Sequence, residues 1–302
     1  MADNLIAENA HGNSDGIENS NKSSEPEGVV ADLSRPSYQE IPGLFDKGLL
    51  LICDHAGNSF PEGYETLGLP DSQLSRHIAY DIGAAGVTRE LSRLLNVPAL
   101  LYQYSRLLID PNRSIEDPTL VMRLSDGAIV PGNAKINEDE IRKRIESYYQ
   151  PYHLRIENLI EKMKATGRVP ALFSIHSFTD NWKGKKRIWD STILWDRDPR
   201  FARPLLAALE KEQDIVVGEN VPYSGQLKGD CLYQHGTVNG LAHALIEIRQ
   251  DLIVTEEGQR TWAERLARII SNLFAEKEFN RALNEVKMFG SHTDHSVGST
   301  EY

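Results

Sequence analysis

Four short polar segments directly follow runs of apolar residues, and their side chains are of types that perform chemistry. The segments are residues 54–58 (DHAGN), 110–113 (DPNR), 176–177 (HS) and 247–249 (EIR). Two histidines and a carboxylate are typical of a zinc site that keeps one coordination position open. A separate glutamate could act as a general base, and an arginine beside an asparagine suits binding of a carboxylate.

Each of these segments also has a simpler structural explanation. A histidine after a strand is more often a hydrogen-bonded structural residue than a metal ligand, and the DPN sequence favours a turn. Glu247 and Arg249 could form a surface ion pair, which contributes little to stability. On a strand, however, both would point to one face, where burial is costly unless that face opens into a site. No short zinc signature such as HExxH occurs.

The elements that would position these groups alternate between apolar strands and amphipathic helices. Compact apolar runs predict strands at residues 49–53, 98–102, 106–109, 169–175, 191–195, 215–217 and 242–248. Helical spacing predicts helices at 75–95, 138–163, 201–211 and 256–281, and Pro151 should kink or split the second. This alternation predicts an α/β fold with a mostly parallel central sheet flanked by helices. Ligands of such sheets bind at the carboxyl ends of the strands.

Composition limits the class of protein. The 302 residues carry a net charge of -11 without a long basic patch, so nucleic-acid binding is not expected. No apolar run is long enough to cross a bilayer, and the polar N-terminus has no signal-peptide pattern. Only two cysteines occur, one of them in an apolar run, which favours a reducing cytoplasm. The densest basic cluster, residues 183–187, is interpreted as a solvated loop.

One folded domain is predicted at residues 36–285. The flanking segments, 1–35 and 286–302, are polar and lack apolar periodicity, so we expect them to be disordered tails. The oligomeric state stays open.

Five separated motifs occur in an order that resembles the N-formylglutamate amidohydrolase family. They are DHAGNSFP, AYDIGAAG, SRLLIDPNRS, SIHS and HALIEIRQD, and they extend from about Leu49 to Ile253. That family is distantly similar to zinc carboxypeptidases and to the succinylglutamate desuccinylase and aspartoacylase group. The resemblance implies a zinc carboxypeptidase-like architecture, a Zn²⁺ cofactor and an N-acyl amino acid as substrate. N-formylglutamate is the expected substrate, with a role in histidine degradation.

The resemblance also implies a ligand set. His55 and His176 match the two zinc histidines of the family. Asn58 stands where the carboxypeptidase-like relatives have a zinc-binding glutamate, and an amide is a poorer ligand than a carboxylate. Either Asn58 binds through its oxygen or Asp81, in the AYDIGA motif, replaces it. A simple pairing of Asp81 with His77, one helical turn away, is the alternative role for that carboxylate.

Further residues are implied to act on the substrate. Asn112 and Arg113 match a pair that binds a carboxylate, and Glu247 matches the general base. Arg249 is a weaker candidate for a catalytic group, and Arg106 could bind a second carboxylate.

The remaining histidines divide into two groups. His235 lies in a polar, Gly-rich run that is typical of an active-site loop, so it is a candidate for substrate binding. His153 and His243 lie within an expected helix and before an expected strand, and both are interpreted as structural.

The predicted activity is therefore zinc-dependent removal of an N-formyl or related N-acyl group from a small acidic amino acid. One alternative is a zinc carboxypeptidase or a deacylase for another N-acyl amino acid. The other is a ligand-binding relative without catalysis, which Asn58 at a ligand position would favour.

Overall fold

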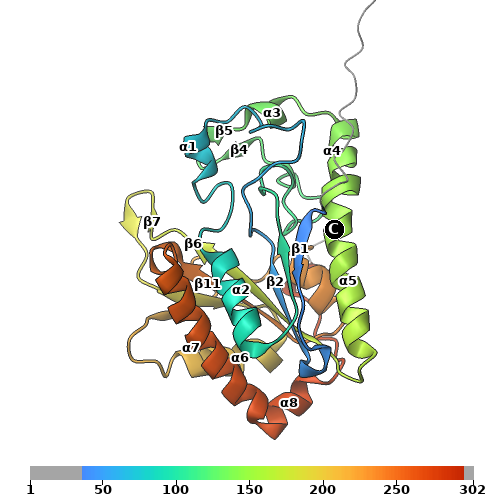
Figure 1. The fold of residues 1–302 in the computed structure, drawn as a ribbon, viewed down its shortest axis with the longest axis vertical. Helices are drawn as coiled ribbons and strands as arrows, with labels where there is room; N and C mark the ends of the chain where they lie inside the picture. Colours follow the sequence, from blue (N-terminus) through green and yellow to red (C-terminus); the bar gives the residue numbers. More distant parts are fainter. Residues whose placement is uncertain (1–35, 296–302) are drawn as a thin grey trace, which may run out of the picture. The chain divides into compact units, whose positions relative to one another are not determined.

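A seven-stranded sheet forms the centre of the protein in the computed structural model, which describes residues 36–295 (Figure 1). Its strands, in spatial order, are β1 (Tyr38–Ile41), β3 (Ala99–Tyr102), β2 (Leu49–Cys53), β6 (Ala171–Phe178), β11 (His243–Arg249), β9 (Ser191–Leu194) and β10 (Val217–Glu219). Neighbouring strands are parallel except at β1–β3 and β11–β9. The prediction of an α/β fold with a mostly parallel sheet is confirmed.

Helices cover both faces of this sheet. One face packs against α2 (Ala84–Leu95), α6 (Pro199–Leu209), α7 (Glu256–Ala275) and α8 (Lys277–Leu283). The other face packs against α5 (Gln150–Lys164), which Figure 1 shows across the sheet from α2 and α7. Within residues 36–295, no helix is both long enough and apolar enough to span a membrane.

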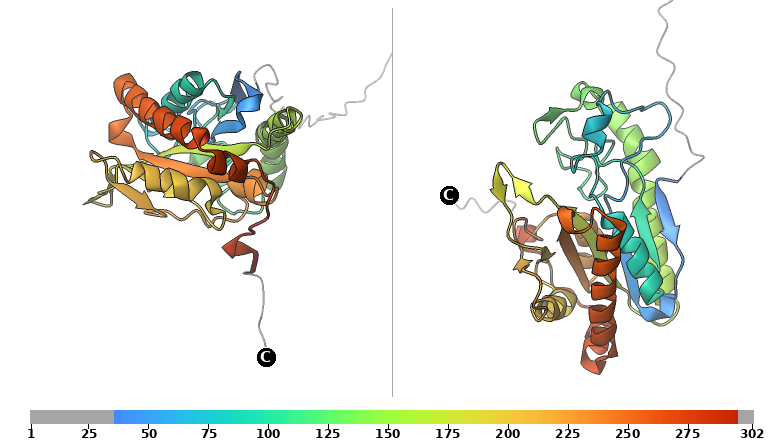
Figure 2. Two further views of the ribbon diagram at one scale, coloured as in Figure 1. Left: turned by 90° about the horizontal axis from the view of Figure 1, so that it is seen from below. Right: turned by 60° about the vertical axis from the view of Figure 1, so that its left-hand side comes forward.

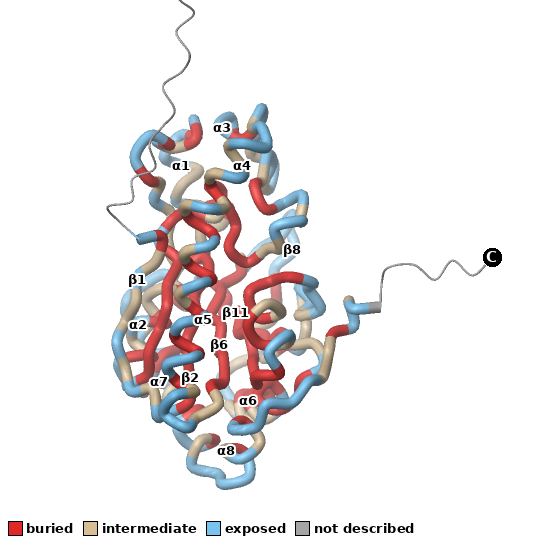
Figure 3. The backbone as a smooth tube through the Cα atoms, turned by 90° about the vertical axis from the view of Figure 1, so that its right-hand side faces the viewer, coloured by how far each residue is buried: buried red, intermediate tan, exposed pale blue. Residues whose placement is uncertain are grey.

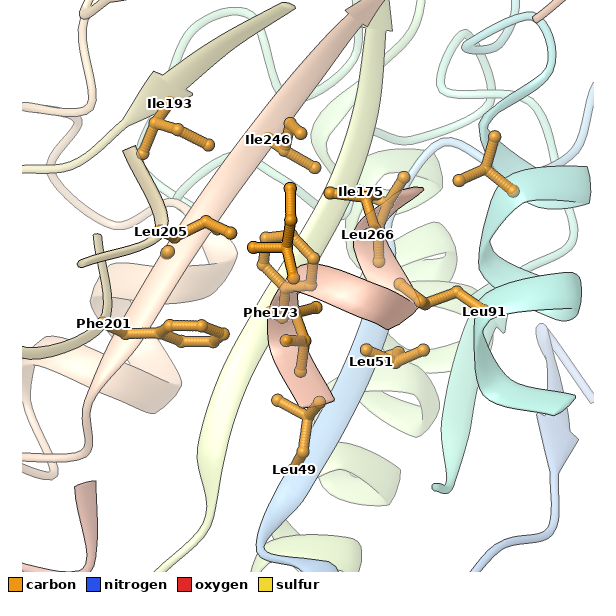
Figure 4. Packing of buried hydrophobic residues seen from close by; sticks show 14 of the residues in the cluster. Leu49, Leu51, Leu91, Phe173, Ile175, Ile193, Phe201, Leu205, Ile246 and Leu266 are labelled. Carbon is orange, nitrogen blue, oxygen red and sulfur yellow. The ribbon is translucent and has the colours of Figure 1, made fainter. Parts of the chain in front are cut away.

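The two core faces follow from the alternation of side chains along each strand. Leu49 and Leu51 of β2 and Phe173 of β6 point to the face that α2, α6 and α7 cover (Figure 4). Leu50 and Leu172 point to the opposite face and pack near α5. Full burial of one such side chain stabilises the fold by about 1.5–3 kcal/mol. The central strands are buried along their whole length (Figure 3).

Short elements and turns gather at one end of the sheet (Figure 2). They are α1 (Asp71–Leu74), α3 (Pro131–Ala134), α4 (Glu138–Arg144) and the hairpin of β4 (Leu124–Ser125) and β5 (Ala128–Ile129). A second hairpin, β7 (Asn181–Trp182) and β8 (Lys185–Lys186), follows β6. The connections that follow β2 and β3 therefore lie over the same edge of the sheet.

Two predicted elements were wrong in this region. The helix expected at 75–95 begins only at Ala84, because the preceding Gly83 has a left-handed backbone with φ of 82°. A Cβ at Gly83 would lie 2.1 Å from the carbonyl oxygen of Ile253, so no other residue fits there. The strand expected at 106–109 is a turn, in which the Leu108 amide donates to the Ser105 carbonyl at 2.9 Å.

The long helices are interrupted differently from the expectation. A π-helix, Ile145–Tyr149, joins α4 to α5, and Pro151 lies in the first turn of α5, so the helix continues through the proline. The helix expected at 256–281 divides at Glu276, whose backbone is extended with ψ of 121°.

Residues 286–295 belong to the segment for which composition predicts a disordered tail. The Lys287 amide donates to the Gly240 carbonyl at 2.9 Å, and the Tyr233 hydroxyl donates to Asp294 at 2.7 Å. These residues therefore have defined contacts with the domain. The other predicted tail residues, 1–35 and 296–302, lie outside the described residues.

Candidate functional site

Three adjacent parallel strands bring candidate residues to one edge of the sheet. His55 follows the end of β2, and His176 and Glu247 lie near the ends of β6 and β11. β6 and β11 are paired so that His176 and Glu247 are register partners. Because the strands are parallel, their carboxyl ends meet, as the rule for ligand sites in α/β proteins predicts.

His55, Asp81 and His176 form a buried cluster at this edge. Asp81 Oδ2 lies 2.8 Å from His176 Nδ1 and 3.4 Å from His55 Nδ1. One ligand atom of each residue lies within 4.8 Å of the other two. The Asp81 amide donates to the His55 carbonyl at 2.9 Å, which ties the two loops together. Two imidazole nitrogens and a carboxylate oxygen thus converge on one point, which could hold a metal ion.

The outer nitrogen of each histidine in the cluster donates to a second carboxylate. His55 Nε2 lies 2.7 Å from Asp110 Oδ1, and His176 Nε2 lies 3.1 Å from Asp54 Oδ2. The Nδ1 atoms are therefore the ones directed at Asp81. Carboxylates in this outer position orient metal-binding histidines and increase their basicity.

The charges in the cluster explain the ionisation of its acids. Burial by itself would raise the pKa of Asp110, but Arg106 and His55 hold that pKa well below its usual value. Burial also opposes ionisation of Asp54, yet His176 lowers its pKa to about 2. The pKa of Asp81 is lowered in the same way by His55 and His176, against the effect of burial. All three carboxylates are therefore ionised at neutral pH.

The alternative ligand and the alternative partner lie elsewhere. The Asn58 side-chain amide donates to the Leu74 carbonyl at 2.9 Å, away from the histidines. His77 Nε2 lies 3.4 Å from Asp126, so it does not pair with Asp81. The structure thus joins Asp81, and not Asn58, to His55 and His176.

Glu247 is a buried carboxyl group beside the cluster. Its Oε2 atom has no hydrogen-bond partner among the described residues. Burial raises the pKa of Glu247 to about 7, although the nearby charge of His176 opposes this. A carboxyl group with a pKa near neutrality and a free oxygen is suited to accept and return a proton.

The cluster opens into a cavity of about 310 Å³ that also contains three of the predicted substrate-binding residues. Arg106 is already paired there, at 2.7 Å from Asp110 and 3.7 Å from Asp81. Asn112 accepts the Cys231 amide through Oδ1 at 2.9 Å. Arg113 lines the cavity and forms no ion pair within residues 36–295.

Two predicted site residues are not in this cavity. Arg249 is the last residue of β11, and its guanidinium pairs with Asp190 at 2.8 Å and Asp251 at 2.7 Å. His235 lies against His153, with 2.8 Å between His153 Nδ1 and His235 Nε2. His235 and His153 line a different pocket, and Arg249 does not line the cavity of Glu247. Neither His235 nor Arg249 is therefore placed to contact a ligand bound beside Glu247.

Sequence reasoning missed one arginine beside the cavity. Arg187 was expected in a solvated loop, but it is buried and donates to the Tyr223 hydroxyl at 3.0 Å. Its guanidinium lies over the rings of Phe178 and Tyr223, both of which line the cavity. It forms no ion pair with any described residue. The only local signal was the basic run itself, because Tyr223 is far away in the sequence.

The roles of Asp54 and Asp110 were also not assigned from the sequence, although both belong to the polar segments at strand ends. Together with Asp81 they surround the two histidines. The fold and this site define an α/β protein with a buried His–Asp–His cluster able to hold a metal ion at the carboxyl edge of its sheet.

Comparison with known proteins identifies the family. The sequence model of the N-formylglutamate amidohydrolase family matches residues 47–254, well over half of the chain and the whole of the site. The chain belongs to the N-formylglutamate amidohydrolase family. A search of curated proteins finds no match.

Two solved structures are similar to this one. A protein of Agrobacterium tumefaciens is 33% identical, with a TM-score of 0.72, over 79% of this chain and 96% of its own. The N-formylglutamate amidohydrolase from Ralstonia eutropha JMP134 is 21% identical, with a TM-score of 0.62, over 82% of this chain and 99% of its own. The second likeness supports the fold.

Proposed function

We propose that this chain is a zinc-dependent amidohydrolase that removes an N-formyl or related N-acyl group from a small acidic amino acid such as N-formylglutamate. The observation that carries the proposal is the convergence of His55 Nδ1, His176 Nδ1 and Asp81 Oδ2, with Glu247 on the neighbouring strand. Family membership supports hydrolysis of an amide bond.

The residues of the cluster fit zinc. Two imidazoles and one carboxylate form a ligand set of catalytic zinc sites, which leaves one position for water or substrate. Asp54 and Asp110 supply the outer carboxylates that such histidines usually have. Zinc bound there would supply Lewis-acid polarisation of a water molecule and of the acyl carbonyl.

Glu247 would move the protons of the reaction. A water molecule attacks the acyl carbon, and the free Oε2 of Glu247 accepts the proton that this water loses. A C–O bond forms, the amide C–N bond breaks, and Glu247 passes the proton to the leaving nitrogen. From N-formylglutamate, the products are formate and glutamate.

Arginines would bind the carboxylates of the substrate. We assign Arg113, with Asn112 beside it, to one carboxylate, because Arg113 lines the cavity without an ion pair. Arg187 is a better candidate than Arg106 for a second carboxylate, because Arg106 is already paired with Asp110. An acidic amino acid carries the two carboxylates that these arginines would bind.

The first experiment measures release of a primary amine by the full chain, with zinc bound and after chelation. The substrates are N-formylglutamate, N-formylglutamine, which lacks the side-chain carboxylate, and N-acetylglutamate. We expect release to depend on zinc and to be fastest for N-formylglutamate.

Each result of this experiment has a clear meaning. Preference for N-acetylglutamate would keep the chemistry and change the acyl group. Equal rates for N-formylglutamate and N-formylglutamine would contradict a second carboxylate site. No release from any N-acyl amino acid, with zinc confirmed in the protein, would contradict the proposed function.

A further inference from the structure

A second group of metal-binding side chains lies apart from the Glu247 cavity. His153 of α5, Cys231 and His235 are all buried, and one ligand atom of each lies within 4.8 Å of the other two. His153 and His235 also line a separate pocket of about 1010 Å³. Neither the family likeness nor the proposed reaction uses these three side chains.

The backbone around this group is unusual in two places. His235 lies inside the π-helix Tyr233–Thr237, and the π-helix Ile145–Tyr149 immediately precedes α5, which contains His153. π-helical turns are rare and occur frequently at functional sites. The two turns lie near the two imidazoles, which stack with ring centroids 5.1 Å apart and an interplanar angle of 22°.

Hydrogen bonds define which nitrogen of each ring is available. His153 Nε2 lies 3.0 Å from the Pro111 carbonyl, which can only accept, so Nε2 carries the proton. The lone pair of His153 Nδ1 therefore faces the group and accepts from His235 Nε2 at 2.8 Å. An outer N–H held by a backbone carbonyl is the arrangement that orients a metal-binding histidine.

We propose that His153, Cys231 and His235 form a second metal site, which binds Zn²⁺ or a chemically similar transition-metal ion. The ligands are His153 Nδ1, His235 Nε2 and the Cys231 thiolate, and water from the pocket that the two histidines line would complete the set. Two imidazoles and a thiolate suit these ions and do not suit Mg²⁺ or Ca²⁺.

Binding changes protonation in a defined way. The Cys231 thiol loses its proton to solvent, and the proton of His235 moves from Nε2 to Nδ1. Nitrogen ligands of a tetrahedral zinc lie roughly 3.3 Å apart, since Zn–N bonds are about 2.0–2.1 Å. The two imidazoles, now 2.8 Å apart at the facing nitrogens, therefore need to separate by about half an ångström.

This second site is adjacent to the first. The Asp54 carboxylate lies beside the Cys231 thiol and also accepts from His176 Nε2 at 3.1 Å. Asp54 therefore contacts both groups. Burial and the charge of Asp54 raise the pKa of the Cys231 thiol, so a bound cation is needed to stabilise the thiolate. The second site does not depend on the proposed function, because none of its ligands lines the Glu247 cavity.

Cobalt spectroscopy separates the two sites. Co²⁺ is added to the chelator-treated full chain, and absorption is followed in the near ultraviolet, where a cobalt–thiolate bond gives a charge-transfer band. We expect this band in the unmodified protein, because only the second site contains a thiol. Cys231→Ser should lose the band and still bind Co²⁺ at the His55–Asp81–His176 cluster.

Three variants serve as controls. Cys53→Ser should keep the band, since Cys53 is the other cysteine of the chain and is no part of the group. His55→Gln should keep the band while it loses Co²⁺ at the first cluster. His235→Phe should weaken the Co²⁺ affinity that the band reports by more than about tenfold, and it tests the site should Cys231→Ser fail to fold.

Two results would overturn the second site. One is the absence of a charge-transfer band in the folded, unmodified chain at saturating Co²⁺. The other is a band that persists in Cys231→Ser and disappears in Cys53→Ser. Neither result bears on hydrolysis at Glu247, so the second site and the proposed function are tested separately.

Discussion

The two buried histidine pairs of this protein are alike in burial and opposite in electrostatics. In the first pair, each imidazole lies between two carboxylates: His55 between Asp81 and Asp110, and His176 between Asp81 and Asp54. In the second pair, His153 and His235 contact each other, and His153 also contacts a backbone carbonyl.

This difference changes the ionisation of the rings. Burial by itself would lower the pKa of His176, but hydrogen bonds to Asp54 and Asp81 raise it well above its usual value. Without such partners, burial lowers the pKa of His153 to about 4 and that of His235 to about 3. At His176 the two carboxylates outweigh the effect of burial, whereas the rings of His153 and His235 have no carboxylate hydrogen-bonded to them.

The two histidine groups differ in the metal ions that they suit. The carboxylates of the first cluster concentrate negative charge, which a bound divalent cation would neutralise, and the Oε2 atom of Glu247 would stay free to accept a proton. The second group is neutral until Cys231 loses its proton, so it selects for ions that bind sulfur. We therefore expect catalysis to depend on the first cluster.

The largest expected effect is that of Glu247→Gln. The variant removes the proton acceptor beside the first cluster and keeps the shape of the side chain, so kcat should fall by about 10²–10⁴-fold. Zinc content and the thermal midpoint should stay near those of the unmodified protein. Near-normal turnover would show that Glu247 is not the general base.

Asp110→Asn tests whether the outer carboxylates distinguish the two groups. The variant removes the charge that holds His55 Nε2, and the zinc affinity of the first cluster should fall by about 10–100-fold. Competition with a chelating dye measures this affinity. The Co²⁺ affinity of the second group, measured from the cobalt–thiolate band, should stay unchanged. An equal loss of metal affinity at both groups would contradict their separation.

Arg113→Ala tests the assignment of a substrate carboxylate to the first cavity. Hydrogen bonds to charged groups contribute about 1.5–3 kcal/mol, so KM for N-formylglutamate should rise by roughly tenfold or more, with a smaller change in kcat. The matched control is Arg249→Ala, since Arg249 pairs with Asp190 and Asp251 outside the cavity. An equal rise in KM for both variants would remove the special role of Arg113.

The smallest expected effect concerns His243. This residue is buried and, like His153 and His235, has no carboxylate hydrogen-bonded to its ring. Burial lowers the pKa of His243, although its hydrogen bond to the Leu241 carbonyl opposes this. Below its unfolded pKa of about 6.5, the unfolded chain binds the proton more readily, so stability decreases as pH falls.

Thermal melts between pH 7 and pH 5 measure this dependence. His243→Asn should reduce the pH slope of the free energy of unfolding by less than about 1.4 kcal/mol per pH unit. The slope that remains is the sum over the other groups with shifted pKa values, among them His153 and His235, which are lowered, and Glu247, which is raised. A slope that is unchanged or steeper in the variant would contradict the lowered pKa of His243.

Local sequence patterns were sufficient for the strands that position His55, His176 and Glu247, but not for the segment of Asp81, which was expected within a helix and precedes α2. The apolar run at 49–53 is β2, with the same bounds as predicted, because five consecutive apolar residues suit a strand buried on both faces. His55, His176 and Glu247 were found from their places after apolar runs, since carboxyl ends of parallel strands meet at one edge. The turn at 106–109 was missed because its apolar residues are buried without being in a strand.

What the sequence by itself determined is thus the α/β class, most strands of the central sheet, the edge at which the site lies and the family to which the motifs point. Only the tertiary structure placed Asp81, and not Asn58, beside His55 and His176, placed His235 beside His153, and placed Arg187 beside the cavity. The physical reason is distance along the chain. Periodicity records which residues are buried, whereas contacts such as Asp81 with His176 depend on how separate loops pack over the end of the sheet.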